Sequence, residues 1–253
     1  MIHEAAARGF ARAAVEYERG RPAYPPAAIR RLAEAVGIGA GRVVLDLAAG
    51  TGKLTRLLAE TGADLVAVEP VAEMRAALER SLPDATVLAG TAEAIPLPDA
   101  STDAVVVGSA FHWFRGDEAL AEIHRVLRPG GALGLAWNAR DESVPWVAEL
   151  TAIMEPHRGS APHYRPGAWR EAFARSALFT PLEHAEFAHV HLLEPEGVVA
   201  RVASVSFIAA LPEDVRADVL DRVRALLARD PATRGRTLVE LPYRTDVFWC
   251  RRR

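Results

Sequence analysis

Val43-Val-Leu-Asp-Leu-Ala-Ala-Gly-Thr-Gly-Lys-Leu-Thr55 predicts a buried strand, a tight turn and the start of a helix. The run 43–47 suits a strand covered on both faces, and residues 53–60 carry leucines at helical spacing. Gly50 and Gly52 lack a Cβ, so they permit positive φ and a close approach of a ligand to the main chain. The free N–H groups at the helix start then face that ligand.

The spacing within this loop separates three kinds of nucleotide site. A phosphate-binding P-loop needs glycine where Leu47 stands and serine or threonine where Leu54 stands. A dinucleotide site is weakened, because its third small position is occupied by Thr55. The third kind uses Asp46 at the strand end, since its carboxylate repels a pyrophosphate and attracts a ligand with an ammonium group.

Bulk composition predicts one large α/β domain. The chain has 253 residues, half of them hydrophobic, and a net charge of −3. That charge gives no positive field, so we expect no nucleic-acid partner. We expect a monomer or homodimer. The chain has one cysteine, Cys250, and shows neither a secretory signal nor an apolar span, which favours a cytoplasmic protein away from membranes.

Two motifs carry a family resemblance. The segment from Asp46 to Gly52 resembles the first motif of class I S-adenosylmethionine-dependent methyltransferases, an acidic residue followed by Gly-x-Gly-x-Gly, with Ala48 in place of the first glycine. Arg125-Val-Leu-Arg-Pro-Gly-Gly131 resembles a structural signature of the small-molecule branch, which includes UbiE-like and trans-aconitate methyltransferase-like enzymes.

The resemblance implies an α/β fold: a Rossmann-like, seven-stranded, mostly parallel sheet with helices on both faces and an antiparallel last strand. Residues 1–253 would form a single domain with an N-terminal lid segment at about 1–26 and a helical, substrate-side insertion at about 139–180. Hydrophobic runs place the strands at 43–47, 64–68, 85–88, 104–108, 132–137 and 182–193, and the last at 237–250, broken near Pro242.

The resemblance also implies S-adenosyl-L-methionine as cofactor, S-adenosyl-L-homocysteine as product, and no metal. Glu69 lies at the tip of the second strand, some twenty residues past the loop, where a carboxylate accepts both ribose hydroxyls. The N-terminal pattern Tyr17…Arg21-Pro-Ala-Tyr24-Pro also resembles this branch, in which it lies over the ligand. With the loops after the first four strands it completes the predicted cofactor site: Tyr17, Arg21, Asp46, Ala48, Gly50, Gly52, Glu69, Pro70, Met74, Thr91, Ala92, Glu93, Ala110 and Phe111.

Aromatic residues and a histidine follow the fourth strand, where ligands sit in open α/β sheets. His112 is the candidate acid–base residue, although it could instead hydrogen-bond a backbone group or the cofactor. The candidate substrate contacts are Tyr24, Trp113, Trp146 and His163. His189 and His191 share a face of a strand, but no third ligand has metal-site spacing, so we expect no metal.

The leading hypothesis is methyl transfer from S-adenosylmethionine to a small molecule, with a small carboxylic acid or related metabolite favoured by the resemblance. The atom methylated, oxygen, nitrogen or carbon, stays open. An NAD-dependent oxidoreductase on a Rossmann-like fold is the runner-up, disfavoured by Asp46 and Thr55. A third hypothesis is a methyltransferase fold that has lost catalysis and acts as a binding module, for which Ala48 is the only support.

Overall fold

The computed structural model describes residues 21–159, 164 and 167–253. Within these ranges the strands are β1 Val43–Leu47, β2 Asp64–Val68, β3 Thr86–Leu88, β4 Thr102–Gly108, β5 Leu127–Arg140, β6 Glu183–Leu193 and β7 Val239–Arg251. The α-helices are α2 Pro26–Val36, α3 Lys53–Ala59, α4 Ala72–Ser81, α5 Gly116–Val126, α6 Pro145–Met154, α7 Arg170–Arg175, α8 Pro195–Ala203, α9 Ser206–Ala209 and α10 Glu213–Arg229. Two short 3-10 helices are η1 Phe111–Trp113 and η2 Glu155–His157.

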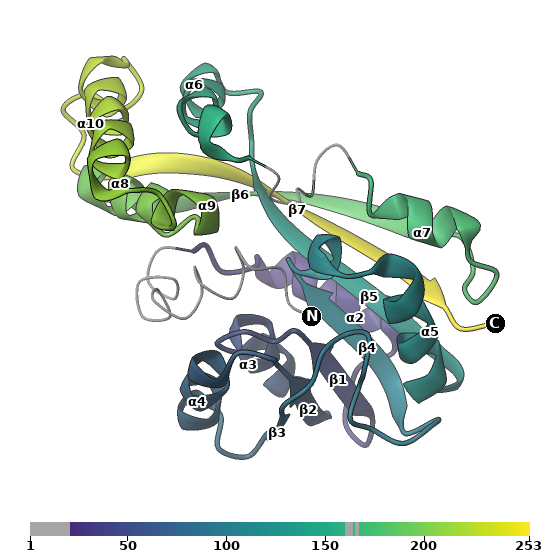
Figure 1. Cartoon of the computed structure of the whole chain (residues 1–253). Coiled ribbons are helices and arrows are strands. Elements are labelled where there is room, and N and C mark those ends of the chain that lie inside the picture. The colour runs from purple at the N-terminus through teal and green to yellow at the C-terminus, as the bar shows by residue number, and fades with distance from the viewer. Residues whose placement is uncertain (1–20, 160–163, 165–166) are drawn as a thin grey trace.

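The strands form one seven-stranded sheet in the order β3-β2-β1-β4-β5-β7-β6. Neighbours from β3 to β5 pair in parallel, and β7 runs antiparallel between β5 and β6 (Figure 1). The order reverses between β1 and β4, so the carboxyl ends of these two strands flank the crevice where open sheets bind ligands. This arrangement confirms the predicted Rossmann-like, mostly parallel sheet.

Helices cover both faces of the sheet. Helices α2 and α3 pack on one face through Leu32, Leu54 and Leu58, against Val44, Val106 and Val247 of the strands. Helices α5 and α7 cover the other face, where Leu120 and Ile123 meet Val105, Leu133 and Phe248. These apolar rows are the helical stripes read from the sequence, and their burial holds the β1 and β4 ends in place.

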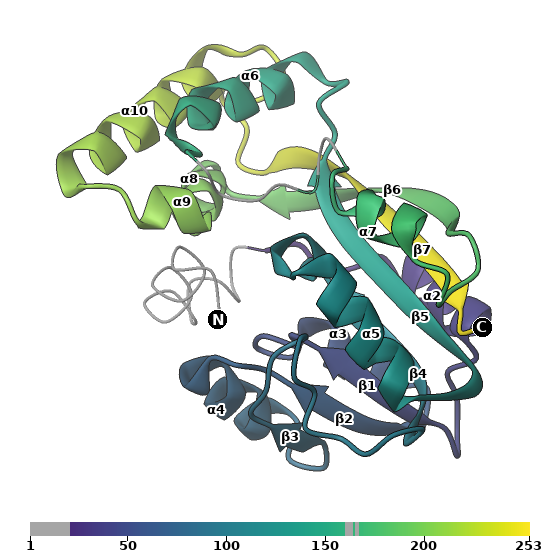
Figure 2. The same cartoon turned by 45° about the vertical axis from the view of Figure 1, so that its right-hand side comes forward.

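The long strands β5, β6 and β7 extend past the parallel part of the sheet and carry a second cluster of helices. Helices α6, α8, α9 and α10 gather there, above the crevice side (Figures 1 and 2). This helical cluster has its own apolar core, with Trp146, Leu150, Val198, Val223 and Leu226 at its centre.

Two expectations about the C-terminal half are corrected. Strand β7 is not broken near Pro242, which pairs with Val190 of β6. Pro242 directly precedes Tyr243, the first residue of β7 that pairs with β5, so its missing N–H removes no bond to β5. Its carbonyl accepts the N–H of Asp141 at 3.0 Å.

The region 139–180 is not one helical unit. Residues 139–140 end strand β5, α6 packs on α10 in the helical cluster, and α7 packs on α5 at the opposite side of the sheet. Trp169 is buried among aromatic residues. No helix among residues 21–159, 164 and 167–253 is long and apolar enough to cross a membrane.

Candidate active site

The loop after β1 has the backbone that its glycines predicted. Ala48, Gly50 and Gly52 take positive φ angles of 58°, 59° and 85°. Only Ala48 carries a Cβ in this left-handed conformation, at the position where the resembled motif has glycine. The loop therefore exposes its main chain to the pocket at the carboxyl end of β1, with α3 beginning at Lys53.

Asp46 lies at the base of this loop and is only 1% exposed. Its Oδ2 accepts a hydrogen bond from Thr55 Oγ1 at 2.7 Å, whereas its buried Oδ1 has no partner among the described residues. Burial raises the pKa of Asp46 to about 7, the Thr55 hydroxyl opposes that shift, and nearby Glu69 adds to it. A cationic donor beside Oδ1 would satisfy the orphaned oxygen and restore the charged form.

Glu69 ties the tip of β2 to the glycine loop. Its Oε2 accepts the N–H of Gly50 at 2.9 Å, and its Oε1 accepts the N–H of Val71 at 2.8 Å. Burial raises the pKa of Glu69, although both N–H groups and Arg75 work in the opposite direction. Each carboxylate oxygen has a second lone pair, so this geometry leaves acceptor capacity for ligand hydroxyls.

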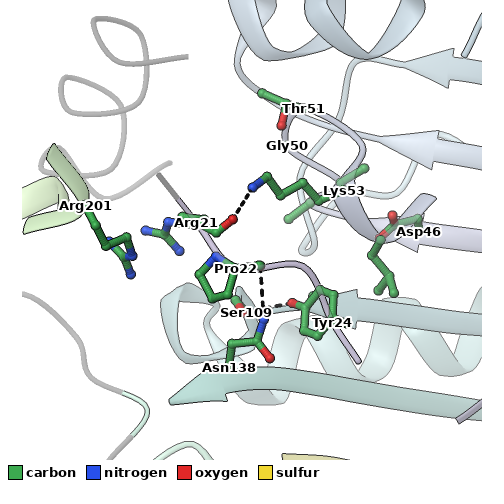
Figure 3. Close-up of a pocket in the computed structure, with 14 residues that line it drawn as sticks. Arg21, Pro22, Tyr24, Asp46, Gly50, Thr51, Lys53, Ser109, Asn138 and Arg201 are labelled. Carbon is green, nitrogen blue, oxygen red and sulfur yellow. Dashed lines mark hydrogen bonds between the residues drawn. The ribbon is translucent and has the colours of Figure 1, made fainter. Parts of the chain in front are cut away.

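Residues 21–24, the described end of the predicted lid segment, form a strap across the crevice (Figure 3). Lys53 Nζ donates to the carbonyl of Arg21 at 2.6 Å, and Asn138 Nδ2 donates to the carbonyls of Pro22 and Ala23, each at 3.2 Å. The Tyr24 hydroxyl lies 3.0 Å from Ser109 Oγ. These bonds fix the strap to α3, β4 and β5, and so enclose the pocket above the glycine loop.

The loop between β3 and β4 brings Thr91, Ala92 and Glu93 to the sheet edge beyond Glu69. Thr91 pairs with Ala94, Ala92 is buried, and Glu93 Oε1 accepts the N–H of Arg115 at 2.9 Å. Near this edge, Met74 of α4 is buried, with its Sδ close to Gly50. Pro70 directly follows Glu69 and precedes α4.

Arg125 of the sequence signature anchors that loop. Its Nη2 donates to the carbonyl of Ile95 at 2.9 Å, and its Nη1 donates to the carbonyl of Leu97 at 2.8 Å and to Asp99 at 2.9 Å. Glu122 accepts from both Nε and Nη2. The signature therefore has the structural role expected of it.

His112 lies in the 3-10 turn that follows β4 and Ala110. Its Nδ1 accepts the indole N–H of Trp137 at 3.1 Å, and the ring centroid of Trp113 is 5.3 Å away. A neutral histidine that accepts at Nδ1 carries its proton on Nε2. In this tautomer Nε2 donates a hydrogen bond, which suits an oxygen or a carbonyl better than it suits removal of a proton.

Two predicted ligand contacts lie in cores instead. Phe111 is 1% exposed and packs on Phe114, Trp169 and Phe173, so its ring is not a wall of the pocket. Trp146 is buried in the helical cluster, because α6 turns its apolar side toward α8 and α10. Tyr17 and His163 lie outside the described residues.

The pocket brings together residues that sequence reasoning had not assigned to it, from four different elements. It is lined by Arg21, Pro22, Tyr24, Asp46, Ala48, Ala49, Gly50, Thr51, Lys53, Leu54, Gly108, Ser109, Asn138 and Arg201. Of these, Ser109 and Asn138 come at or near the carboxyl ends of β4 and β5, a position that could have signalled them. Arg201 lies in a helix far along the chain, and nothing in its sequence surroundings pointed to the crevice.

His189 and His191, the histidine pair weighed as metal ligands, take other contacts. His189 Nδ1 lies 3.3 Å from Thr245 Oγ1, and its ring stacks on Tyr243. In the part of the chain that the structure describes, no group of three or more His, Cys, Asp or Glu side chains is placed to hold a metal ion.

Comparison with known proteins agrees with this geometry. Residues 45–135, which include the glycine loop, Glu69 and the signature, match the family model described as a methyltransferase domain. An uncharacterized methyltransferase of Mycobacterium tuberculosis is 46% identical over 236 residues, covering 93% of this chain and 92% of that protein. The chain belongs to the class I S-adenosylmethionine-dependent methyltransferases.

A solved structure has the same fold as this methyltransferase. A putative type II methyltransferase from Anaeromyxobacter dehalogenans superposes with a TM-score of 0.67 at 25% identity, covering 92% of this chain and 97% of that one. A demethylmenaquinone methyltransferase of Renibacterium salmoninarum is 40% identical over 108 residues, which is 42% of this chain and 46% of that protein. The likeness to that enzyme therefore covers less than half of either chain.

Proposed function

We propose that this methyltransferase transfers the methyl group of S-adenosylmethionine to a small, anionic metabolite, with a small carboxylic acid favoured. The observation that carries the cofactor assignment is at Asp46, which lines the pocket and whose buried Oδ1 has no hydrogen-bond partner among the described residues. A ligand ammonium would supply the missing donor and charge. The residues present therefore fit the methionine part of the cofactor.

Other residues would hold the rest of the cofactor. Glu69 would accept the ribose hydroxyls with its remaining lone pairs while it keeps the Gly50 and Val71 N–H groups. Met74 would offer its thioether to the adenine, and the loop at Thr91, Ala92 and Glu93 would border the ring. When bound, the cofactor supplies a methyl group on a sulfonium, which is a good leaving group.

The protein's own part in catalysis would then be positioning. The strap at residues 21–24 would exclude water, and pocket residues would hold the acceptor atom in line with the methyl group, at about 3 Å. A carboxylate acceptor needs no base. An alcohol, phenol or amine must lose a proton, and His112 would take it only at Nδ1, after giving up the Trp137 hydrogen bond. In its present tautomer His112 would instead donate from Nε2 and orient an acceptor oxygen that needs no base.

The two other hypotheses have less support. An NAD-dependent oxidoreductase would place a pyrophosphate near Asp46, whose carboxylate disfavours it. A binding module without activity rested on Ala48 alone, and Ala48 adopts the positive φ that the glycine loop needs. A cytoplasmic location and a monomeric or homodimeric state stay predictions.

A transfer assay tests the proposal. The protein would be incubated with S-adenosylmethionine that carries a labelled methyl group, and with a panel of mono-, di- and tricarboxylates, matched neutral amides and phenols. We expect label in an ester of a carboxylate and none in its amide. Label in the phenols alone would overturn the carboxylate preference, and no label in any pool of metabolites would contradict methyl transfer to a small molecule.

A further inference from the structure

Among the described residues that line the pocket, Arg201 is a buried cation without an acid beside it. Arg201 of α8 is 8% exposed and lines the pocket. Its Nη1 donates to Ser204 Oγ at 3.3 Å, its Nε has no partner, and no carboxylate of the described residues pairs with it. Burying a guanidinium without a counter-charge is costly, so the site is arranged for an anion that arrives from outside.

More positive charge lies beside Arg201. Arg140 ends strand β5, and its pKa is lowered to about 10, first by burial and further by Arg201 and Arg158, with Tyr243 and Glu142 acting in the opposite direction. Lys53 stands at the start of α3 on the same pocket. Several like charges are thus held together, and an anion bound among them would relieve their repulsion.

Next to these arginines, neutral hydrogen-bonding side chains lie along the sheet. Arg140, Tyr243 and His189 are register neighbours on β5, β7 and β6, so their side chains share one face. Tyr243 Oη, His189 Nε2 and His191 Nδ1 are buried atoms without partners in the described part of the chain. Arg201 lies close enough to lower the pKa of His191, although burial is the larger cause.

The pocket therefore has two ends of opposite charge. Asp46 and Thr51 lie at the end formed by the glycine loop, and Arg201 lies at the other end, under the helical cluster, with Lys53 and Arg21 between them (Figure 3). Lys53 and Arg21 are nearer the loop and can serve the carboxylate of the cofactor itself. Arg201 comes from a different layer of the molecule, on the side where an acceptor would enter.

We propose that Arg201, with Arg140 and His191 beside it, forms an anion subsite that binds a carboxylate or phosphate group of the acceptor. The assignment of that anion as acceptor rests on the proposed function, but anion binding can be measured without turnover. The subsite deepens the preference for a carboxylic acid by naming the side chain that recognises its charge, and it extends that preference to phosphorylated metabolites.

The test is a calorimetric titration at constant ionic strength. Citrate and inorganic phosphate would be titrated separately into protein saturated with S-adenosylhomocysteine, with glucose as the uncharged probe. We expect at least one anion to bind and Arg201→Gln to weaken it by about tenfold or more, as for loss of a charge-assisted hydrogen bond. Arg201→Lys should keep part of the affinity. Arg222→Gln, an exposed change on α10, should leave it unaltered.

The outcomes separate this inference from the function on which it rests. Unchanged anion affinity in Arg201→Gln, or no anion binding in the wild type, overturns the subsite. Loss of S-adenosylhomocysteine binding in a folded Arg201→Gln protein also overturns it, because Arg201 would then be a cofactor contact. If the wild type binds anions through Arg201 but does not bind S-adenosylhomocysteine, the subsite stands and the proposed function fails. The affinities measured for citrate and for phosphate show which anion the subsite prefers.

Discussion

At the scale of single residues, the carboxyl of Asp46 couples cofactor binding to pH. Its pKa is raised to about 7 in the free protein, mainly by burial, and an ammonium ligand requires the charged form. Binding should therefore release about 0.9 proton at pH 6 and about 0.1 at pH 8. Calorimetry in two buffers with different ionisation enthalpies measures this release.

The raised pKa of Asp46 also makes the stability of the free protein depend on pH. The folded pKa of Asp46 lies above the ordinary aspartate value of 3.8, which applies to the unfolded chain, so the free folded protein holds an extra proton between these two pKa values and loses stability as pH rises from about 4 through 7. Asp46→Asn removes this titration, and it should flatten that part of the stability curve while abolishing cofactor binding. Equal proton release by wild type and Asp46→Asn would remove Asp46 from the linkage.

Ala48 gives a second prediction for a single residue. Its φ of 58° is strained for alanine, so Ala48→Gly should stabilise the folded state by about 1–2 kcal/mol through relief of that strain. Glycine also raises the entropy of the unfolded chain, which should offset up to about 1 kcal/mol of this gain. We expect the free energy of unfolding to stay level or rise. The control Ala77→Gly, in helix α4, should cost about 1 kcal/mol. Chemical denaturation measures both, and a loss at Ala48 as large as at Ala77 would contradict the strain.

At the scale of elements, Arg125 holds the loop that borders the predicted adenine site. Arg125→Lys keeps the charge but cannot reach the carbonyls of Ile95 and Leu97 and both oxygens of Glu122 together. We expect a loss of about 1–3 kcal/mol in the free energy of unfolding and weaker cofactor binding. Arg175→Lys is the matched control, since its ion pairs are exposed and should contribute under about 1 kcal/mol.

At the scale of the whole molecule, the helical cluster has an apolar core separate from those that cover the sheet. Leu226→Ala should cost about 2–5 kcal/mol by leaving a cavity in that core. We expect hydrogen exchange to speed up in α6, α8 and α10 while the amides of β1 and β4 stay protected. Equal loss of protection in all of them would show that the molecule opens as one unit.

Much of the fold could be predicted because its signals are local. The apolar runs of β1, β2 and β4 and the glycine turn at residue 50 decide the parallel sheet, whichever ligand it binds. The reach of β5 to Arg140 and the continuity of β7 through Pro242 were missed, since both depend on a neighbouring strand. A proline is tolerated there only because of where the partner strand ends.

Residues at strand ends were placed in the crevice by their positions along the chain, whereas their roles in binding stay predictions. Asp46, Gly50 and Glu69 lie where their positions along the chain placed them. Phe111 was misjudged, because the 3-10 turn directs its ring into the core and no periodicity marks that direction. Arg201 reaches the pocket only because α8 folds back over the ends of β6 and β7, a long-range packing that a single sequence does not contain.

The most direct test of the central claim is calorimetric titration with S-adenosylmethionine, S-adenosylhomocysteine and NAD, each separately. We expect micromolar binding of the two sulfur ligands, about −8 kcal/mol, and none of NAD. Glu69→Ala should abolish binding by removing the ribose acceptor and the tether to Gly50, whereas Glu73→Ala, an exposed change on α4, should not. Binding of NAD alone, or unchanged binding in Glu69→Ala, would contradict this account.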